Sequence, residues 1–360
     1  MKWPDSGFGH QRQEDATKEV EGTSSRKADH LRINLEREVS GAVRSGFDRY
    51  RFDHTALPEL DLADVSTASS LFGRSLRAPI LVSCMTGGTE EAARCNRLLA
   101  EVAQEHGLAM GLGSGRVLLE DPGAPGFDVR RLAPDVPLLA NLGGAQLNRG
   151  KGVDDCRHLL ELTGSDALVL HLNPLQEALQ PEGEPRFRGL LSRIAELCSL
   201  LEQPVIVKEV GFGLSERVVA ELFEAGVAGV DVAGAGGTSW SEVERHRMSG
   251  TAARVALAFR SWGIPTAEAL VAARRVAGDR LVIGSGGISN GMEAAIAIAL
   301  GADLAGLAGP FLRAAAQGAE AAADLAVEVA EVLRVVMFCV GAKDLAAFRA
   351  TPRLVARDPG

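Results

Sequence analysis

Short apolar runs alternate with longer stretches rich in Ala, Leu, Glu and Arg from residue 78 to near the end of the chain. Each run ends at Gly or at a small polar residue, and its continuous apolar character is typical of a parallel strand covered on both faces. Eight continuous β/α units favour a closed (β/α)₈ TIM barrel over an open doubly wound sheet. The pattern predicts these strands at Ile80–Ser83, Leu108–Leu112, Pro137–Leu142, Ala167–Leu172, Pro204–Val210, Gly229–Ala233, Leu281–Ser285 and Asp303–Ala308.

Three stretches depart from this alternation. Trp240–Leu270 is too long for a single crossover helix and includes Gly263-Ile264-Pro265, so it is expected to hold an insertion. Ala314–Val340 predicts one long helix, which a short helical tail follows. Residues 1–25 are polar and aperiodic, which predicts a disordered extension ahead of a single α/β domain at residues 26–360.

Composition and charge restrict the classes of function. The chain has 360 residues, of which 46% are hydrophobic, and this is enough for one large core. Its 38 basic and 47 acidic residues give a net charge of −9, which argues against nucleic acid or a membrane surface as the partner. The five cysteines show no CxxC spacing, no apolar run is long enough to span a membrane, and no hydrophobic signal segment opens the chain. We therefore expect a soluble, cytoplasmic protein.

Polar side chains gather where the fourth apolar run ends. Asn173 and Pro174 by themselves fit the start of a helix, with Asn173 as the N-cap and Pro174 in the first turn. That interpretation leaves His171, Gln176 and Glu177 unexplained, and buried polar groups are costly unless they are satisfied. We therefore expect a ligand site here, at which Asn173 could both cap the helix and bind the ligand.

Glycine-rich turns follow the last three predicted strands, at Gly236-Gly237-Thr238, Gly286-Gly287 and Ala308-Gly309. Such turns expose backbone N–H groups at helix N-termini, and barrels often bind phosphate after strands seven and eight. A single turn of this kind would be an ordinary connection, but three in succession favour a phosphate cradle. Arg26-Lys27-Ala28-Asp29-His30 is either a solvated helix start, which the residues alone favour, or a clamp for an anion.

The predicted barrel mouth also holds polar groups suited to a flat heterocycle. Lys208 ends the fifth run, where an unpaired charge is costly, so it needs a negative partner such as Glu209, Asp231 or a cofactor. Asn141 and Thr86 offer an amide and a hydroxyl group at other strand ends. A phosphate-bearing flavin is the cofactor that these groups favour.

The loop motifs together resemble the type 2 isopentenyl-diphosphate isomerase family. The resemblance extends from about Arg26 to about Leu345. The stretch His171–Glu177, with Gln180-Pro181-Glu182-Gly183 after it, is the most specific part. The other motifs are Arg26-Lys27 with His30, Met85-Thr86-Gly87-Gly88, Gly113-Ser114-Gly115-Arg116, Ala140-Asn141-Leu142-Gly143, Gly236-Gly237-Thr238-Ser239 and Gly284–Ile288.

The resemblance implies an FMN-bound barrel that interconverts isopentenyl and dimethylallyl diphosphate. It implies reduced FMN, Mg²⁺, NADPH as the reductant, and a homo-oligomer, a tetramer or an octamer. The implied FMN contacts are Met85, Thr86, Gly87, Ser114, Asn141, Lys208, Thr238, Gly286, Gly287, Ala308 and Gly309. The implied substrate contacts are Arg26, Lys27, Ser114, Arg116, His171, Asn173 and Gln176, with Glu177 as the Mg²⁺ ligand. Gln176 and Lys208 are the implied catalytic residues, and because an amide is a poor acid, flavin is favoured as the acid–base group with Gln176 in a positioning role.

The chain departs from the family pattern at two positions. Gly115 stands where the family usually has Gln between Ser and Arg, which removes an amide from the substrate loop. Ser289 stands where the family often has a basic residue after Gly-Gly-Ile, which removes a charge near the FMN phosphate.

Three other functions compete with the isomerase. An FMN-dependent 2-hydroxy-acid oxidase or dehydrogenase needs a His and an Arg near the end of strand six, and Asp231–Gly237 contains neither. An inosine-monophosphate-dehydrogenase-like enzyme needs a nucleophilic Cys in a mobile loop, and no cysteine follows a later strand. A non-enzymatic flavin-binding protein is supported only by Gly115 and Ser289.

Overall fold

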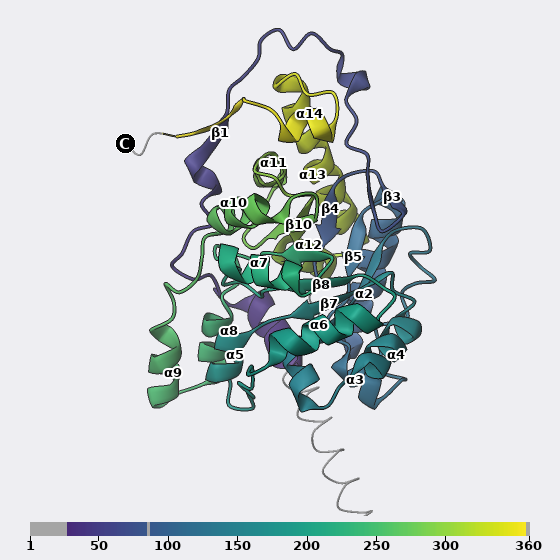
Figure 1. Ribbon diagram of the computed structural model, residues 1–360. Coiled ribbons are helices and arrows are strands. Elements are labelled where there is room, and N and C mark those ends of the chain that lie inside the picture. Colours follow the sequence, from purple (N-terminus) through teal and green to yellow (C-terminus); the bar gives the residue numbers. More distant parts are fainter. Residues whose placement is uncertain (1–26, 85–86, 358–360) are drawn as a thin grey trace, which may run out of the picture.

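Eight parallel strands form a closed barrel in the computed structural model, which describes residues 27–84 and 87–357 (Figure 1). Around the barrel the strands follow the order β10-β11-β4-β5-β6-β7-β8-β9. All eight coincide with the predicted runs, so the prediction of a (β/α)₈ barrel is confirmed. Their bounds are β4 (Ile80–Val82), β5 (Ala109–Gly111), β6 (Leu138–Gly143), β7 (Ala167–His171), β8 (Val205–Lys208), β9 (Gly229–Asp231), β10 (Leu281–Ser285) and β11 (Leu304–Leu307).

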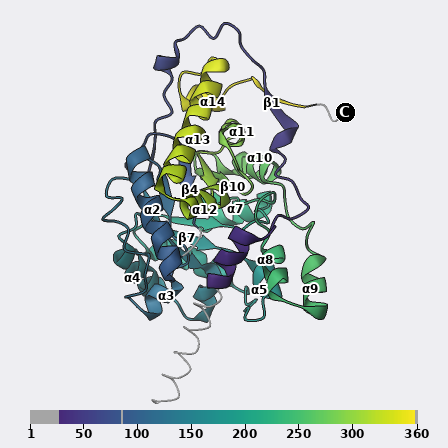
Figure 2. The same ribbon diagram turned by 180° about the vertical axis from the view of Figure 1, so that it is seen from behind.

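The strands are apolar along their length because both of their faces are covered. Leu81, Leu139 and Ile206 point into the barrel and pack with residues of the other strands in one interior cluster. Alternate residues, such as Ile80 and Val82, join the larger core cluster. The helices surround the strands in both views of the molecule (Figures 1 and 2). The alternation of side chains across a strand thus divides one apolar sequence between two cores.

Helices follow the strands and surround the barrel. The first of them, α2 (Glu90–His106), begins where Thr89 Oγ1 accepts a hydrogen bond from Ala92 N and ends at Gly107, whose φ is 65°. The cap and the left-handed glycine are the usual signals for the two ends of a helix. The remaining helices of the barrel layer are α3 (Arg116–Glu120), α4 (Val153–Thr163), α5 (Pro174–Leu179), α6 (Leu190–Leu200), α7 (Glu216–Glu224), α10 (Thr266–Ala277), α11 (Gly291–Ala299) and α12 (Gly309–Gln317).

The predicted insertion and the predicted C-terminal helix differ in outcome. The long crossover between β9 and β10 does hold an insertion, in which α8 (Trp240–Arg247) and α9 (Gly250–Leu257) precede α10. The prediction of a single long helix at Ala314–Val340 is wrong, because α12 ends at Gln317 and α13 (Ala319–Cys339) begins after Gly318. Gly318 has a φ of 133°, which is incompatible with a continuous helix. The helical tail exists as α14 (Leu345–Arg349).

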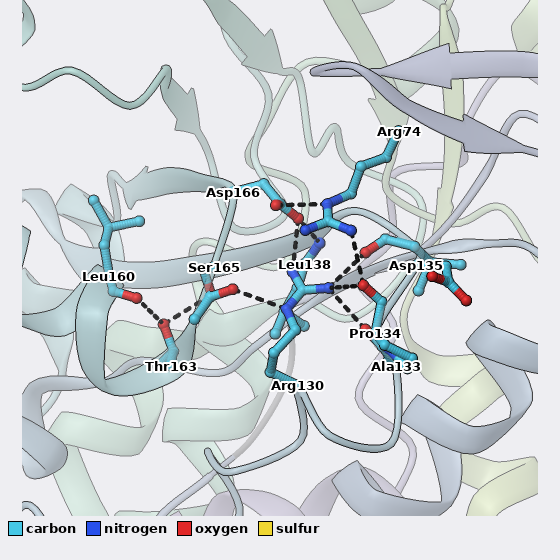
Figure 3. Close-up of polar contacts among 12 residues, drawn as sticks. Arg74, Arg130, Ala133, Pro134, Asp135, Leu138, Leu160, Thr163, Ser165 and Asp166 are labelled. Carbon is cyan, nitrogen blue, oxygen red and sulfur yellow. Dashed lines mark hydrogen bonds and ion pairs between the residues drawn. The ribbon is translucent and has the colours of Figure 1, made fainter.

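A hairpin closes the end of the barrel opposite the mouth. Its strands are β2 (Ser69–Leu71) and β3 (Arg74–Leu76), and Leu71 and Leu76 pack against the interior cluster of the barrel. Arg74 Nε donates to Asp166 Oδ1 at 2.6 Å, and Arg130 donates to Asp166 Oδ2 at 2.7 Å (Figure 3). Since Asp166 immediately precedes β7, this double ion pair ties the hairpin to the amino ends of the strands.

The segments at the two ends of the described chain also pack on the barrel. β1 (Tyr50–Phe52) pairs antiparallel with β12 (Leu354–Ala356), so the N-terminal arm is tied to the C-terminal tail. Residues 27–36 are helical, and the predicted disordered extension at residues 1–25 lies outside the described residues. None of the described helices has both the length and the apolar composition needed to cross a membrane. The described residues also form the 3₁₀ helices η1 (Phe47–Arg49), η2 (Leu62–Asp64) and η3 (Gly144–Arg149).

Candidate active site

One cavity of about 710 Å³ occupies the carboxyl ends of the barrel strands. It collects the predicted site residues from loops far apart in the sequence, as the closed barrel requires. Arg26, Met85 and Thr86 lie outside the described residues. The other predicted residues all line the cavity: Lys27, Gly87, Ser114, Arg116, Asn141, His171, Asn173, Gln176, Glu177, Lys208, Thr238, Gly286, Gly287, Ala308 and Gly309.

Asn173 stands at the N-cap position of α5, as predicted, but its side chain does not cap the helix. Its side chain accepts no capping hydrogen bond, and Nδ2 instead donates to Gln176 Oε1 and to Glu177 Oε1, both at 3.0 Å. The predicted positions of Asn173 and Pro174 at the start of the helix are confirmed, whereas a capping hydrogen bond from the Asn173 side chain is not formed. Asn173 and Gln176 are 5% and 7% exposed, so these hydrogen bonds are shielded from bulk water.

Glu244 on α8 is a buried carboxylate beside the site that the sequence did not single out. It is completely buried, and its Oε1 accepts hydrogen bonds from Gln176 Nε2 at 3.2 Å and from His30 Nε2 at 2.9 Å. Its Oε2 accepts from Arg247 at 2.7 Å. Burial alone would raise the pKa of Glu244, but hydrogen bonds and charges from His30 and Arg247 outweigh it and hold the pKa below its usual value.

This carboxylate fixes the orientation of two amides in succession. An ionised Glu244 can only accept, so the Gln176 NH₂ group faces it and the Gln176 carbonyl oxygen faces Asn173. Asn173 must then present its own NH₂ group to Gln176 and to Glu177. The only sequence signal for Glu244 was its place in an acidic, helical insertion with Glu242, and that pattern is typical of a solvent-exposed helix.

The helix at residues 27–36 crosses the mouth of the barrel. Lys27 Nζ donates to the carbonyl oxygen of Ser114 at 3.1 Å, in the loop after β5. At the other end Asn34 Oδ1 accepts from Thr238 at 3.2 Å, in the loop after β9. Between them, the His30 ring packs edge-on against Trp240 with 5.0 Å between ring centroids. Lys27 therefore lines the cavity and does not begin a solvated helix that is separate from it.

Lys208 lies inside the mouth at 8% exposure. Its Nζ donates to the backbone carbonyl of Glu209 at 2.6 Å, while the Glu209 carboxylate accepts from the N–H groups of the turn that follows it. No carboxylate among the described residues lies within 4.0 Å of Lys208 Nζ, although Lys208 opposes the burial that raises the pKa of Asp231. Neither Glu209 nor Asp231 therefore forms a close ion pair with Lys208, although the Lys208 charge also opposes the burial that raises the pKa of Glu209. Lys208 lines the cavity.

The remaining polar groups at the mouth are held in fixed positions. His171 Nδ1 lies 2.7 Å from Asn141 Oδ1, so the amide orients the imidazole ring. Ser83 Oγ is buried, lines the cavity and has no hydrogen-bond partner among residues 27–84 and 87–357. A buried hydroxyl without a partner is costly, so the floor of the cavity offers a hydrogen bond to a ligand.

The backbones of two glycine turns, Gly236-Gly237 and Gly286-Gly287, pack directly against each other at one end of the cavity. A Cβ atom on Gly237 would lie 2.6 Å from Gly287 N, and Gly286 and Gly287 have φ values of 104° and 75°. Within the described part of the chain, the N–H groups of Gly286, Gly287 and Gly309 donate to no acceptor. Unsatisfied N–H groups that line a cavity favour an anionic ligand, as the sequence predicts.

Glu177 lines the cavity, and Gly115 lies between two residues that line it, Ser114 and Arg116. Glu177 Oε2 accepts from Glu184 N at 2.8 Å. No group of three or more His, Cys, Asp or Glu among the described residues could hold a metal by itself. The departure at Gly115 has a structural reason, because a Cβ atom there would lie 2.5 Å from Leu159 Cδ1, and Leu159 is fully buried.

Comparisons with known proteins agree with this geometry. A family profile described as FMN-dependent dehydrogenase matches residues 175–355. The isopentenyl-diphosphate delta-isomerase of Synechococcus sp. is 54% identical over 90% of this chain and 94% of that protein. The chain belongs to the isopentenyl-diphosphate delta-isomerase family. Another member, from Xanthobacter autotrophicus, is 49% identical over 92% of this chain and 97% of its own.

Solved structures similar to this family member establish the fold alone. A lactate oxidase from Pediococcus acidilactici superimposes with a TM-score of 0.67 at 14% identity and covers 95% of this chain and 94% of its own. A mandelate oxidase variant with 4-Br-2-hydroxy-methylphenylacetate superimposes with a TM-score of 0.64 at 18% identity, over 96% of this chain and 98% of that one. The resemblance to oxidases therefore lies in the barrel, whereas the resemblance to isomerases includes the loops.

The donor role of Asn173 can be tested against the capping role by one substitution. Asn173→Asp preserves the shape and a capping oxygen, but it removes the NH₂ group and places a negative charge beside Glu177. We expect the variant to lose about 2 kcal/mol of unfolding free energy, because the acceptors on Gln176 and Glu177 lose their donor. Urea denaturation measures this loss; stability equal to that of the unmodified protein would identify Asn173 as a cap after all.

Proposed function

We propose that this protein converts isopentenyl diphosphate into dimethylallyl diphosphate with reduced FMN and Mg²⁺, and that NADPH supplies the reducing electrons. The double bond moves by one position, and the reaction has no net redox change. One observation carries the proposal. The same cavity is lined by the glycine turns with free N–H groups, by the buried Lys208, and by Gln176 with its neighbours Asn173 and Glu177. The family membership supports the same reaction.

The cavity suits FMN at one end. The N–H groups of Gly286, Gly287 and Gly309 suit its phosphate, and Asn141 suits the polar edge of its ring system. Lys208 is positioned to hold the negative charge of the reduced form. Bound in this form, FMN would supply an electron-rich aromatic face and an acid–base group for the alkene.

The opposite end suits a diphosphate with Mg²⁺. Lys27, Arg116 and His171 line it and provide donors for phosphate oxygens. Glu177 provides a carboxylate held by Asn173 and by Glu184 N. Magnesium commonly uses one or two protein carboxylates with substrate phosphate oxygens and water, so a single Glu177 suffices without a larger protein cluster.

Gln176 positions the reacting part of the substrate in this proposal. Its amide is a poor acid, but Glu244 and Asn173 hold it in one orientation at the wall of the cavity. The anionic Glu244 behind it is shielded from water and favours positive charge that develops on the substrate in the transition state. Glu244 is therefore a positioning residue that acts through Gln176.

An oxidase acting on 2-hydroxy acids is the alternative on the same barrel. Such chemistry needs a base and a cation for the substrate carboxylate after the sixth strand. The segment Asp231–Gly237 at the end of that strand contains no His and no Arg, so the isomerase is favoured.

We further propose a cytoplasmic homo-oligomer, a tetramer or an octamer, with a single domain at residues 26–360. The net charge of −9 supports a partner other than nucleic acid or a membrane surface.

An assay of the two redox states tests the proposed reaction. The purified protein is loaded with FMN, divided, and one portion is reduced with dithionite before isopentenyl diphosphate and Mg²⁺ are added. We expect dimethylallyl diphosphate only from the reduced portion. Hydrogen peroxide released by the oxidised portion with lactate or glycolate, without any isomerisation by the reduced portion, would support the oxidase.

Removal of the Gln176 amide should slow the reaction without loss of the cofactor. Gln176→Ala is expected to lower kcat by about a hundredfold, because the substrate loses the group that orients it. The FMN dissociation constant should stay within about twofold of the original. Flavin fluorescence measures the second quantity, and unchanged turnover would exclude the role of Gln176.

Replacement of the Glu177 carboxylate should weaken magnesium-dependent binding. Glu177→Gln is expected to raise the Mg²⁺ concentration required for half-maximal activity by about tenfold or more, since an amide is a poorer ligand for a hard cation. Glu184→Gln is the matched control, because Glu184 also lines the cavity but pairs with Arg149 at 2.8 Å. Identical Mg²⁺ titrations for Glu177→Gln and the unmodified protein would contradict the assignment.

A further inference from the structure

Two helices begin at the end of the cavity that the glycine turns form, and only one is open to a ligand. At the start of α11, Asn290 Oδ1 accepts from Glu293 N at 3.0 Å. Glu293 Oε2 accepts from both Ser289 N and Ser289 Oγ at 2.7 Å. Both donors of Ser289 and the N–H group of Glu293 are thus occupied, and Glu293 adds a negative charge there. No residue of α11 lines the cavity.

The start of α12 has no such cap. Gly309 N has no acceptor in the described part of the chain, and Ala308 and Gly309 both line the cavity. The N-terminus of a helix carries partial positive charge, so an anion is stabilised there. The phosphate end of the cavity therefore centres on α12 and on the turn at Gly286 and Gly287.

Arg313 lies at this same helix start. Its side chain runs back toward the N-terminus of α12, and one guanidinium nitrogen lies 3.0 Å from the position that a Cβ atom on Gly309 would occupy. Arg313 also lines the cavity. A cation beside the positive end of a helix is electrostatically unfavourable by itself. The arrangement becomes favourable when an anion lies between the guanidinium group and the free N–H groups.

No described side chain supplies that anion. Arg313 forms no ion pair within 4.0 Å among residues 27–84 and 87–357. The nearest candidate, Glu38, has its Oε1 occupied by Ser40 N at 2.8 Å. Hydrogen bonds from Ser40 are the main cause that lowers the pKa of Glu38, and the charges of Arg260 and Arg313 contribute less.

We propose that the Arg313 guanidinium binds the phosphate of FMN and replaces the basic residue that this chain lacks at position 289. The inference rests on the proposed FMN cofactor and identifies the cation for its phosphate. Ser289 cannot serve, because its donors are engaged by Glu293. The absence of a side chain on Gly309 leaves the space through which Arg313 reaches the cavity.

Binding of FMN and of riboflavin, which lacks the phosphate, separates this contact from all others. Apoprotein of the full chain is titrated with each flavin, and the ratio of the two dissociation constants is the readout. Arg313→Gln is expected to weaken FMN binding by about tenfold to a hundredfold, as for loss of a charge-assisted hydrogen bond, and to leave riboflavin binding unchanged. Arg313→Lys should retain much of the preference for FMN, because it keeps the charge.

Arg260→Gln is the matched control. Arg260 acts on Glu38 as Arg313 does, but it does not line the cavity, so its removal should not alter the ratio. If Arg313→Gln leaves the ratio of the FMN and riboflavin dissociation constants unchanged, the role of Arg313 is overturned. An unmodified protein that binds riboflavin as tightly as FMN would instead overturn the proposed cofactor and leave the isomerase without its phosphate cradle.

Discussion

A carboxylate with no access to water organises the substrate side of this protein. Glu244 receives hydrogen bonds from three segments: the helix at residues 27–36 through His30, α5 through Gln176, and its own helix through Arg247. Removal of one partner from a buried ion pair typically costs about 3–5 kcal/mol, so these segments cannot separate without a large penalty. The helix at residues 27–36, which crosses the barrel mouth, and the Gln176 amide are therefore held by the same carboxylate, Glu244.

The cavity has two electrostatic ends, and the barrel sets the separation between them. At one end lie backbone N–H groups without acceptors, together with Lys208 and Arg313, neither of which forms an ion pair within 4.0 Å among the described residues. At the other, Glu177 introduces a negative charge among cationic side chains, which is the arrangement that a diphosphate with Mg²⁺ needs. A cofactor and a substrate that both carry phosphate can thus occupy one cavity without competition for the same donors.

The sequence predicted the barrel because strands covered on both faces leave an uninterrupted apolar signal. Strand order then placed His171, Asn141 and Lys208 at one mouth, as closure of eight strands requires. Glu244 escaped prediction because its burial depends on helix 27–36, a contact between residues more than two hundred positions apart. The break between α12 and α13 at Gly318 was not predicted, because a glycine in an Ala-rich stretch can also continue a helix. Its positive φ becomes known only from the packing of the two helices.

In the proposed reaction, reduced FMN takes part in each turnover and is not oxidised. A count of product molecules for each reducing equivalent tests this claim most directly. The FMN-loaded protein is reduced with one equivalent of NADPH or dithionite without oxygen and given a large excess of isopentenyl diphosphate with Mg²⁺. The account predicts many molecules of dimethylallyl diphosphate for each reducing equivalent, with the flavin still reduced at the end. One product molecule for each equivalent, with the flavin oxidised, would contradict it.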